Sequence, residues 1–133
     1  MGPFVLDASA VLDYLLGTDR AKDVSSVLRA GGADLRTPYL CDVEVASVIR
    51  RVLLRGDMTS ERADEALIGY ALLPLLRHGH LRLLPRVLEL RDKFSAPDAT
   101  YVALAEELGG TLVTTDVPFA RAVRMRRHVE VLP

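Results

Sequence analysis

The 133-residue sequence lacks the features that would stabilise it outside a reducing compartment or anchor it to a membrane. Its one cysteine, Cys41, cannot form an internal disulfide, which favours a reducing cytoplasm. No apolar run reaches the roughly 20 residues of a membrane-spanning helix, and no basic segment with a cleavage site opens the chain. We therefore expect a globular cytoplasmic protein with no membrane association.

The sequence also lacks the strong positive charge of many nucleic-acid-binding proteins. It has 17 basic and 18 acidic residues, a formal net charge of −1, so any binding of nucleic acid must depend on local patches. Lys22 and Lys93 are the only lysines. Arginine suits bidentate contacts to phosphate, but a bias in genome base composition gives the same excess and is the preferred explanation.

Short apolar segments alternate with helical patterns along the chain. We expect strands at residues 4–7, 34–38, 80–84, 111–116 and 128–132, and helices at residues 9–17, 19–32, 41–55, 59–74, 85–94, 95–110 and 117–125. No repeat or linker divides the sequence, so residues 1–133 should form a single domain. The alternation predicts an α/β fold with a mostly parallel central sheet.

Two of the predicted strands end in an aspartate, "FVLD" at Asp7 and "TLVTTD" at Asp116. In open parallel sheets, ligands bind outside the carboxyl ends of the strands, where the strand order reverses. Aspartate is also a good helix N-cap, and that alternative stays open for both residues. Ser9 and Thr115, beside these aspartates, could add hydroxyl hydrogen bonds.

Two further acids lie at the starts of predicted helices. Glu44 borders an apolar stripe, although an acid in a first helical turn is also favourable without any further role. Asp98 follows Ser95 at the spacing of a capping box. It also shares a helix face with apolar residues such as Tyr101, which favours a functional role because a lone buried carboxylate is costly unless it is paired or bound to a cation.

All four acids are compatible with one end of the sheet. Carboxylates brought together repel one another and raise each other's pKa values. Mg²⁺ or Mn²⁺ relieves this repulsion, because both ions prefer carboxylate oxygen and retained water as ligands. Such a site can activate water for in-line attack on a phosphodiester.

Two groups of arginines accompany the acids. Arg50 and Arg51 follow Glu44, and Arg121 and Arg124 follow Asp116 in the segment "RAVRMRR". These side chains are candidates for contacts to RNA phosphates. A solvated helix face is an equally good explanation of both groups.

The motifs "VLDASA", "DVEVASVIRR", "LRDKFSAPDATYVALAEELGG" and "LVTTDVPFARA", in this order, resemble those of PIN-domain ribonucleases of the VapC toxin type. The resemblance covers nearly the whole chain. It implies an αβα sandwich with a parallel sheet. It also implies a Mg²⁺- or Mn²⁺-dependent endoribonuclease of a type II toxin–antitoxin pair, which cuts single-stranded or looped RNA.

The resemblance assigns the family's acidic, metal-binding site to Asp7, Glu44, Asp98 and Asp116. Ser9 and Thr115 become supporting residues. It further implies a homodimer and inhibition by a cognate antitoxin. Two positions depart from the family pattern, because many relatives have an asparagine in place of Ser47 and a tyrosine in place of Pro97. Neither departure removes a metal ligand.

Two other functions remain as alternatives. An aspartate-based phosphoryl-transfer enzyme or receiver module also gathers aspartates at strand ends. Such a phosphatase, however, would need a second aspartate where Ser9 stands. Such enzymes and receivers also use a lysine near the phosphoryl group, and both lysines here lie in predicted helices. The other alternative is a PIN-like domain that has lost activity and serves as a binding partner.

Overall fold

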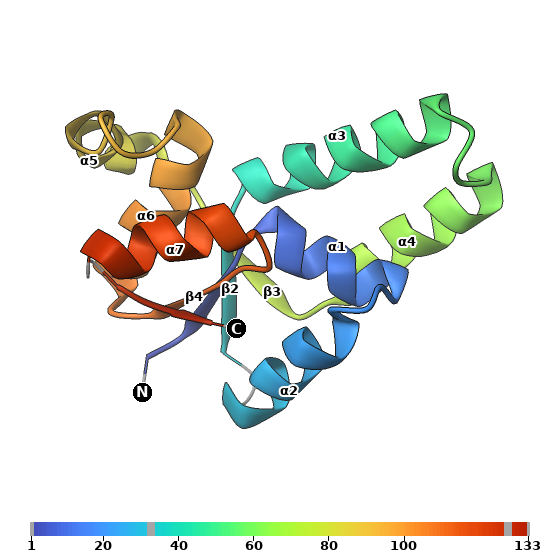
Figure 1. The fold of residues 1–133 in the computed structure, drawn as a ribbon, viewed down its shortest axis with the longest axis horizontal. Coiled ribbons are helices and arrows are strands. Elements are labelled where there is room, and N and C mark those ends of the chain that lie inside the picture. Colours follow the sequence, from blue (N-terminus) through green and yellow to red (C-terminus); the bar gives the residue numbers. More distant parts are fainter. Residues whose placement is uncertain (1, 32–33, 127–128, 133) are drawn as a thin grey trace.

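Five parallel strands form the centre of the fold in the computed structural model, which describes residues 2–31, 34–126 and 129–132 (Figure 1). The strands are Phe4–Leu6 (β1), Leu35–Pro38 (β2), Leu75–His78 (β3), Thr111–Val113 (β4) and Glu130–Leu132 (β5). Their order in the sheet is β3-β2-β1-β4-β5, and each neighbouring pair is parallel. The predicted α/β fold with a parallel central sheet is therefore confirmed.

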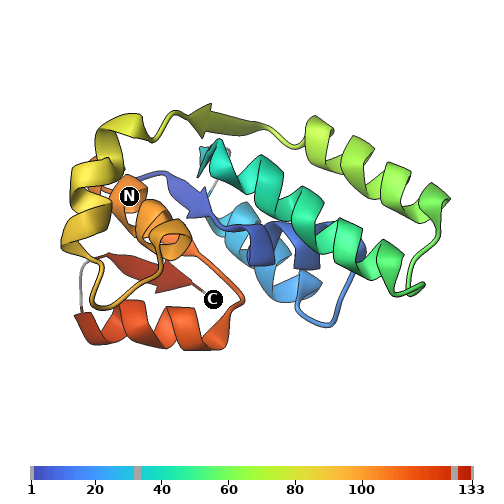
Figure 2. The same ribbon diagram turned by 90° about the horizontal axis from the view of Figure 1, so that it is seen from above.

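Helices cover both faces of this sheet. They are Ala8–Leu16 (α1), Ala21–Gly31 (α2), Leu40–Leu54 (α3), Ser60–Leu72 (α4), Leu84–Glu89 (α5), Ala96–Leu108 (α6) and Val117–Arg126 (α7), with a short 3₁₀ turn at Leu81–Leu83 (η1). Helices α1–α4 lie on one side and α5–α7 on the other (Figures 1 and 2). The chain moves outward from β1 to β3 and then returns across the sheet to β4. Because crossovers between parallel strands are right-handed, this reversal places the later helices on the other side.

The change of direction places a switch point between β1 and β4. These two strands are neighbours, with Leu6 opposite Val113. The helices that follow them leave the sheet on opposite faces, and open parallel sheets bind ligands at the carboxyl ends of the strands at such a point. Asp7 and Asp116 follow these two strands, so the fold itself locates the candidate site.

Helix α6 forms the centre of one layer, because residues 99–105 are all buried. It contacts β1, β2 and β4 on one side and α5 on the other. The Ser95 hydroxyl caps its start, and Gly109 ends it in the left-handed conformation (φ 60°) that glycine adopts without strain. The first turn of α6, which carries Asp98, directly precedes this buried part of the helix.

Helices α3 and α4 form a hairpin that extends beyond the sheet (Figures 1 and 2). Glu44 lies near its base, in the second turn of α3. No helix in the described part of the chain is long and apolar enough to cross a membrane.

The strand predicted at residues 80–84 was wrong. Leu81–Leu83 form the 3₁₀ turn instead, and Leu84 starts α5 with Pro85 in its first turn. The strand is Leu75–His78, directly after Pro74, where it pairs with β2 at the edge of the sheet. The backbone N–H groups of a helix's first turn have no partner within the helix, so a proline there removes no hydrogen bond. Pro85 therefore favours the helix that is seen.

Candidate active site

Asp7 occupies the junction between β1 and α1. Its backbone is extended (φ −89°, ψ 173°), and its N–H donates to the carbonyl of Val113 on β4 (3.1 Å). The side chain is 6% exposed. Asp7 therefore ends the strand, caps the helix and carries a buried carboxylate at the switch point.

The Asp7 carboxylate is surrounded by hydrogen-bond donors. Its Oδ1 accepts from the Ser9 hydroxyl (2.7 Å) and from the backbone N–H of Ala10 (3.0 Å), while its Oδ2 accepts from the Thr114 hydroxyl. Burial and, to a smaller extent, the charge of Asp116 raise the pKa of Asp7 to about 6, although these hydrogen bonds oppose the shift. A positive charge nearby would stabilise the ionised form.

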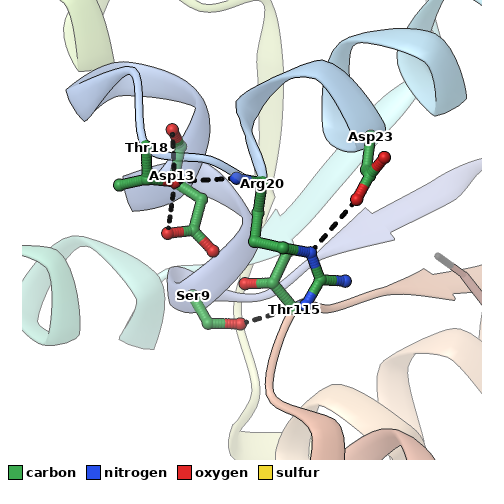
Figure 3. Close-up of polar contacts among 6 residues, drawn as sticks. All are labelled: Ser9, Asp13, Thr18, Arg20, Asp23 and Thr115. Atoms are coloured by element: carbon green, nitrogen blue, oxygen red, sulfur yellow. Dashed lines mark hydrogen bonds and ion pairs between the residues drawn. The ribbon is translucent and has the colours of Figure 1, made fainter.

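Ser9 and two threonines connect this carboxylate to the end of β4. The Ser9 hydroxyl lies 3.1 Å from that of Thr114 and accepts from the backbone N–H of Thr115 (3.1 Å; Figure 3). The hydroxyl beside Asp7 is thus that of Thr114, which is 1% exposed. The side-chain contact expected of Thr115 is made by its neighbour, and Thr115 contributes its backbone N–H instead.

Figure 3 also shows how the turn after α1 is held. The Thr18 hydroxyl donates to Oδ1 of Asp13 (2.9 Å), and the Nε of Arg20 donates to Oδ2 of Asp23 (3.1 Å). The Thr18 hydroxyl also accepts from the backbone N–H of Arg20 (3.3 Å), which links the turn after α1 to the start of α2. The helix that Asp7 caps is therefore fixed at both of its ends.

Asp116 caps the start of α7 and is exposed. Its Oδ1 accepts from the backbone N–H of Phe119 (3.1 Å), and its own N–H donates to the Thr114 hydroxyl (3.1 Å). The N-cap interpretation is thus correct for both Asp7 and Asp116. Capping uses one carboxylate oxygen in each residue, so it does not exclude a second role.

Glu44 is half-buried and faces α6. Its Oε1 accepts a hydrogen bond from the hydroxyl of Tyr101 (2.6 Å). Tyr101 is 2% exposed, so this bond lies inside the protein. Glu44 is therefore held toward the sheet rather than extended into solvent.

Asp98 lies in the first turn of α6 and is half-buried. Burial raises its pKa to about 6, and the negative charges of Asp116 and Glu44 add to the shift, while a hydrogen bond with Ser95 opposes it. The N-cap bond of a capping box is present, since the Ser95 hydroxyl accepts from the Asp98 N–H (3.3 Å). The influence of two other acids shows that Asp98 also belongs to a shared acidic region.

Aromatic packing helps to bring Asp98 and Asp116 to the same region. The rings of Phe94, just before α6, and Phe119, in α7, meet edge to face with centroids 5.9 Å apart. This contact fixes the starts of the two helices relative to each other. The two aspartates are therefore close enough for the charge of Asp116 to act on Asp98.

The four acids are not arranged as a complete set of ligands around one metal ion. Within residues 2–31, 34–126 and 129–132, no three Asp, Glu, His or Cys side chains lie close enough together to hold a metal ion. The acids nevertheless affect one another, because charge repulsion links Asp7 with Asp116, and Asp98 with both Asp116 and Glu44. Oxygen donors in a repelling cluster are the donor set that suits Mg²⁺ or Mn²⁺.

The candidate RNA-binding arginines are all on the surface. Arg50 and Arg51 are exposed on α3, and Arg121 and Arg124 are exposed on α7. Arg124 also donates to the carbonyl of Val131 (3.4 Å). Arg127, from the same basic segment, lies outside the described residues. Their contacts to RNA stay a prediction.

The raised pKa of Asp98 has a consequence for stability. Its pKa is near 3.8 in the unfolded chain and about 6 in the fold, so the folded state binds more protons between these values. Stability should therefore fall as pH rises from about 4 to 6. In EDTA at pH 7.5, Asp98→Asn should melt about 2–4 °C above the unsubstituted protein, and the difference should largely vanish near pH 4.

Thermal melts with and without Mn²⁺ check this expectation. At ten times its dissociation constant, a cation that binds only the folded state contributes roughly 1.4 kcal/mol, and Asp98→Asn should gain less of it. Asp64→Asn, an exposed change on α4, serves as the matched control. A lower melting temperature of Asp98→Asn in EDTA, with a normal response to Mn²⁺, would show that Asp98 is only a helix cap.

Known proteins resemble this chain in both sequence and fold. The PIN domain family matches residues 4–124. The chain is 35% identical over 129 residues to ribonuclease VapC9 of Mycobacterium tuberculosis, covering 97% of this chain and 98% of that protein.

Two solved structures share the fold. One is the M. tuberculosis toxin VapC20, described as cleaving the sarcin–ricin loop (TM-score 0.72, 16% identity, covering 98% of this chain and 99% of that one). The other is a toxin–antitoxin complex from Klebsiella pneumoniae (TM-score 0.61, 18% identity, 86% and 92% covered).

Proposed function

This chain belongs to the PIN-domain family, and we propose that it is a VapC-type endoribonuclease that acts as the toxin of a toxin–antitoxin pair. The observation that carries the proposal is the placement of the four acids. Asp7 and Asp116 follow the two strands at the switch point, while Asp98 and Glu44 approach from α6 and α3. This is the position at which open parallel sheets bind ligands.

We propose that Asp7, Glu44, Asp98 and Asp116 hold Mg²⁺ or Mn²⁺. When bound, such an ion supplies positive charge for the phosphodiester transition state and activates water for attack. The protein contributes the orientation of its carboxylates. Ser9 and Thr114 fix the Asp7 carboxylate, and the backbone N–H of Thr115 fixes Ser9 in turn.

Single-stranded or looped RNA is the proposed substrate class. VapC20 is described as a toxin that cleaves the sarcin–ricin loop, and looped RNA exposes its backbone to a site at the carboxyl ends of the strands. Four exposed arginines flank the acids on α3 and α7 and would contact phosphates: Arg50, Arg51, Arg121 and Arg124. Arginine forms bidentate bonds with phosphate oxygens, which position RNA without reading its sequence.

A homodimer and a cognate antitoxin complete the proposal. The K. pneumoniae structure of similar fold is a toxin–antitoxin complex, which supports a partner protein for this chain. We propose that this partner covers the acidic site. A PIN-like domain without activity is the alternative. It is disfavoured because all four acids are present. Asp7 also remains buried with its pKa raised, and folding alone does not require a buried carboxylate at this position.

Metal-dependent cleavage of RNA is the direct test. The purified protein should cut total RNA in the presence of Mg²⁺ or Mn²⁺ and lose this activity in EDTA, and adding back Mn²⁺ should restore it. Mapping the new RNA ends identifies the cleavage motif. Cleavage that persists in EDTA would contradict the metal assignment, and no cleavage under any condition would favour the inactive alternative.

A further inference from the structure

The hydroxyl of Tyr101 joins two helices that each carry a candidate metal ligand. It lies on α6, and it donates a hydrogen bond of 2.6 Å to Oε1 of Glu44 on α3, 57 residues away in sequence. Tyr101 is 2% exposed, so its hydroxyl has lost its contact with water. A buried hydroxyl without a partner is costly; the Glu44 carboxylate accepts its hydrogen bond, and the hydroxyl also interacts with the buried thiol of Cys41.

Helix α6 therefore positions two of the four acids. Asp98 lies three residues before Tyr101, and residues at this spacing share one face of a helix. Through Asp98, α6 presents one carboxylate directly, and through Tyr101 it holds a second one on a different helix. Without Tyr101, repulsion from Asp98 would leave Glu44 free to turn toward solvent at the base of the α3–α4 hairpin.

We propose that Tyr101 is a positioning residue that holds the Glu44 carboxylate in place for a divalent cation. This inference rests on the proposed function. The hydrogen bond occupies Oε1 and leaves Oε2 for the cation. Carboxylates that bind metals are themselves fixed by hydrogen bonds from neighbouring groups, and the loss of such a group typically weakens metal binding by about 10- to 100-fold.

A second tyrosine provides a matched control. The hydroxyl of Tyr70 on α4, which is 7% exposed, donates to Oδ1 of Asp42 (2.5 Å), two residues before Glu44 on α3. Asp42 is not among the proposed ligands, and the Nε of Arg77 also donates to it (2.8 Å). Tyr70→Phe thus also removes a hydrogen bond from a tyrosine hydroxyl to a carboxylate on α3, while Arg77 keeps Asp42 in place.

Direct measurement of Mn²⁺ binding tests the proposal. The dissociation constant is obtained from the electron paramagnetic resonance signal of free Mn²⁺, in the unsubstituted protein, Tyr101→Phe, Tyr70→Phe, Glu44→Ala and the double variant of Tyr101 and Glu44. We expect Tyr101→Phe to raise this constant about 10-fold or more and Tyr70→Phe to leave it unchanged. In the Glu44→Ala background, Tyr101→Phe should have no further effect.

RNA cleavage provides a second readout. Tyr101→Phe should cleave slowly at limiting Mn²⁺ and approach the original rate at saturating Mn²⁺, because only the occupancy of the site has changed. Thermal melts establish that both tyrosine variants are folded.

Each remaining outcome overturns the inference. Unchanged Mn²⁺ affinity in Tyr101→Phe would do so while leaving the proposed nuclease intact. Equal weakening by Tyr70→Phe, or an undiminished effect of Tyr101→Phe in the Glu44→Ala background, would show a general structural role. If the unsubstituted protein binds no Mn²⁺ at all, the metal site and this inference both fail.

Discussion

Asp7→Asn should lower the rate of RNA cleavage by at least about 100-fold, since even the loss of a group that merely supports a metal ligand costs 10- to 100-fold in affinity or activity. The fold should survive. Asparagine is as good an N-cap as aspartate, so its side-chain oxygen can keep the bond to the Ala10 N–H. The neutral amide also avoids the burial of charge that raises the pKa of Asp7 to about 6.

Cleavage of total RNA and growth of the expressing cells are the two measurements. Expression of the unsubstituted chain should slow growth, and expression of Asp7→Asn at an equal protein level should not. Asp116→Asn, at the end of β4, should behave in the same way, whereas the exposed Asp64→Asn should cleave and slow growth normally. Undiminished cleavage by folded Asp7→Asn would remove Asp7 from the proposed metal site.

Thr114→Val should destabilise the fold by about 2–4 kcal/mol at pH 7, although the two side chains have nearly the same shape. The Thr114 hydroxyl donates to the Asp7 carboxylate and accepts from the N–H of Asp116, so valine removes a partner from two groups at once. Each unsatisfied buried polar group costs about 1–3 kcal/mol, and a charged one more. The loss should shrink near pH 5, where the Asp7 carboxyl is mostly protonated.

Chemical denaturation of Thr114→Val and Thr114→Ser separates the hydroxyl from packing. Serine keeps the hydroxyl and loses a methyl group, so Thr114→Ser should retain most of the hydrogen-bond contribution. Thr115→Val, one residue later, should have a much smaller effect, because the Thr115 contact to Ser9 comes from its backbone N–H. Equal losses in Thr114→Val and Thr115→Val would contradict the network described here.

The elements that carry the strongest local patterns could be predicted from the sequence. The apolar "FVL" segment followed by Asp7 and a helical pattern located β1, α1 and the junction between them. The pattern of residues 95–110 predicted α6, which ends at Leu108, just before Gly109 adopts a positive φ. These signals depend on neighbours in sequence, and the structure confirms the resulting fold class.

Contacts across long sequence distances could not be predicted in the same way. Thr114 and Thr115 are adjacent and chemically identical, and the geometry at the end of β4 decides which hydroxyl reaches Asp7. The strand at Leu75–His78 is held by its pairing with β2 rather than by strong β propensity. The bond between Tyr101 and Glu44 joins two helices whose relative placement no local pattern encodes.

The all-parallel sheet determines how much of the chain must be synthesised before the acidic site can form. Parallel strands cannot pair through a short hairpin, and the Thr114 hydroxyl that holds Asp7 lies 107 residues after it in sequence. Loop closure over this distance must precede any organised site. A ribosome that carries a chain shorter than about residue 116 therefore carries no assembled nuclease. The acidic site is thus assembled only once nearly all of the domain has been translated.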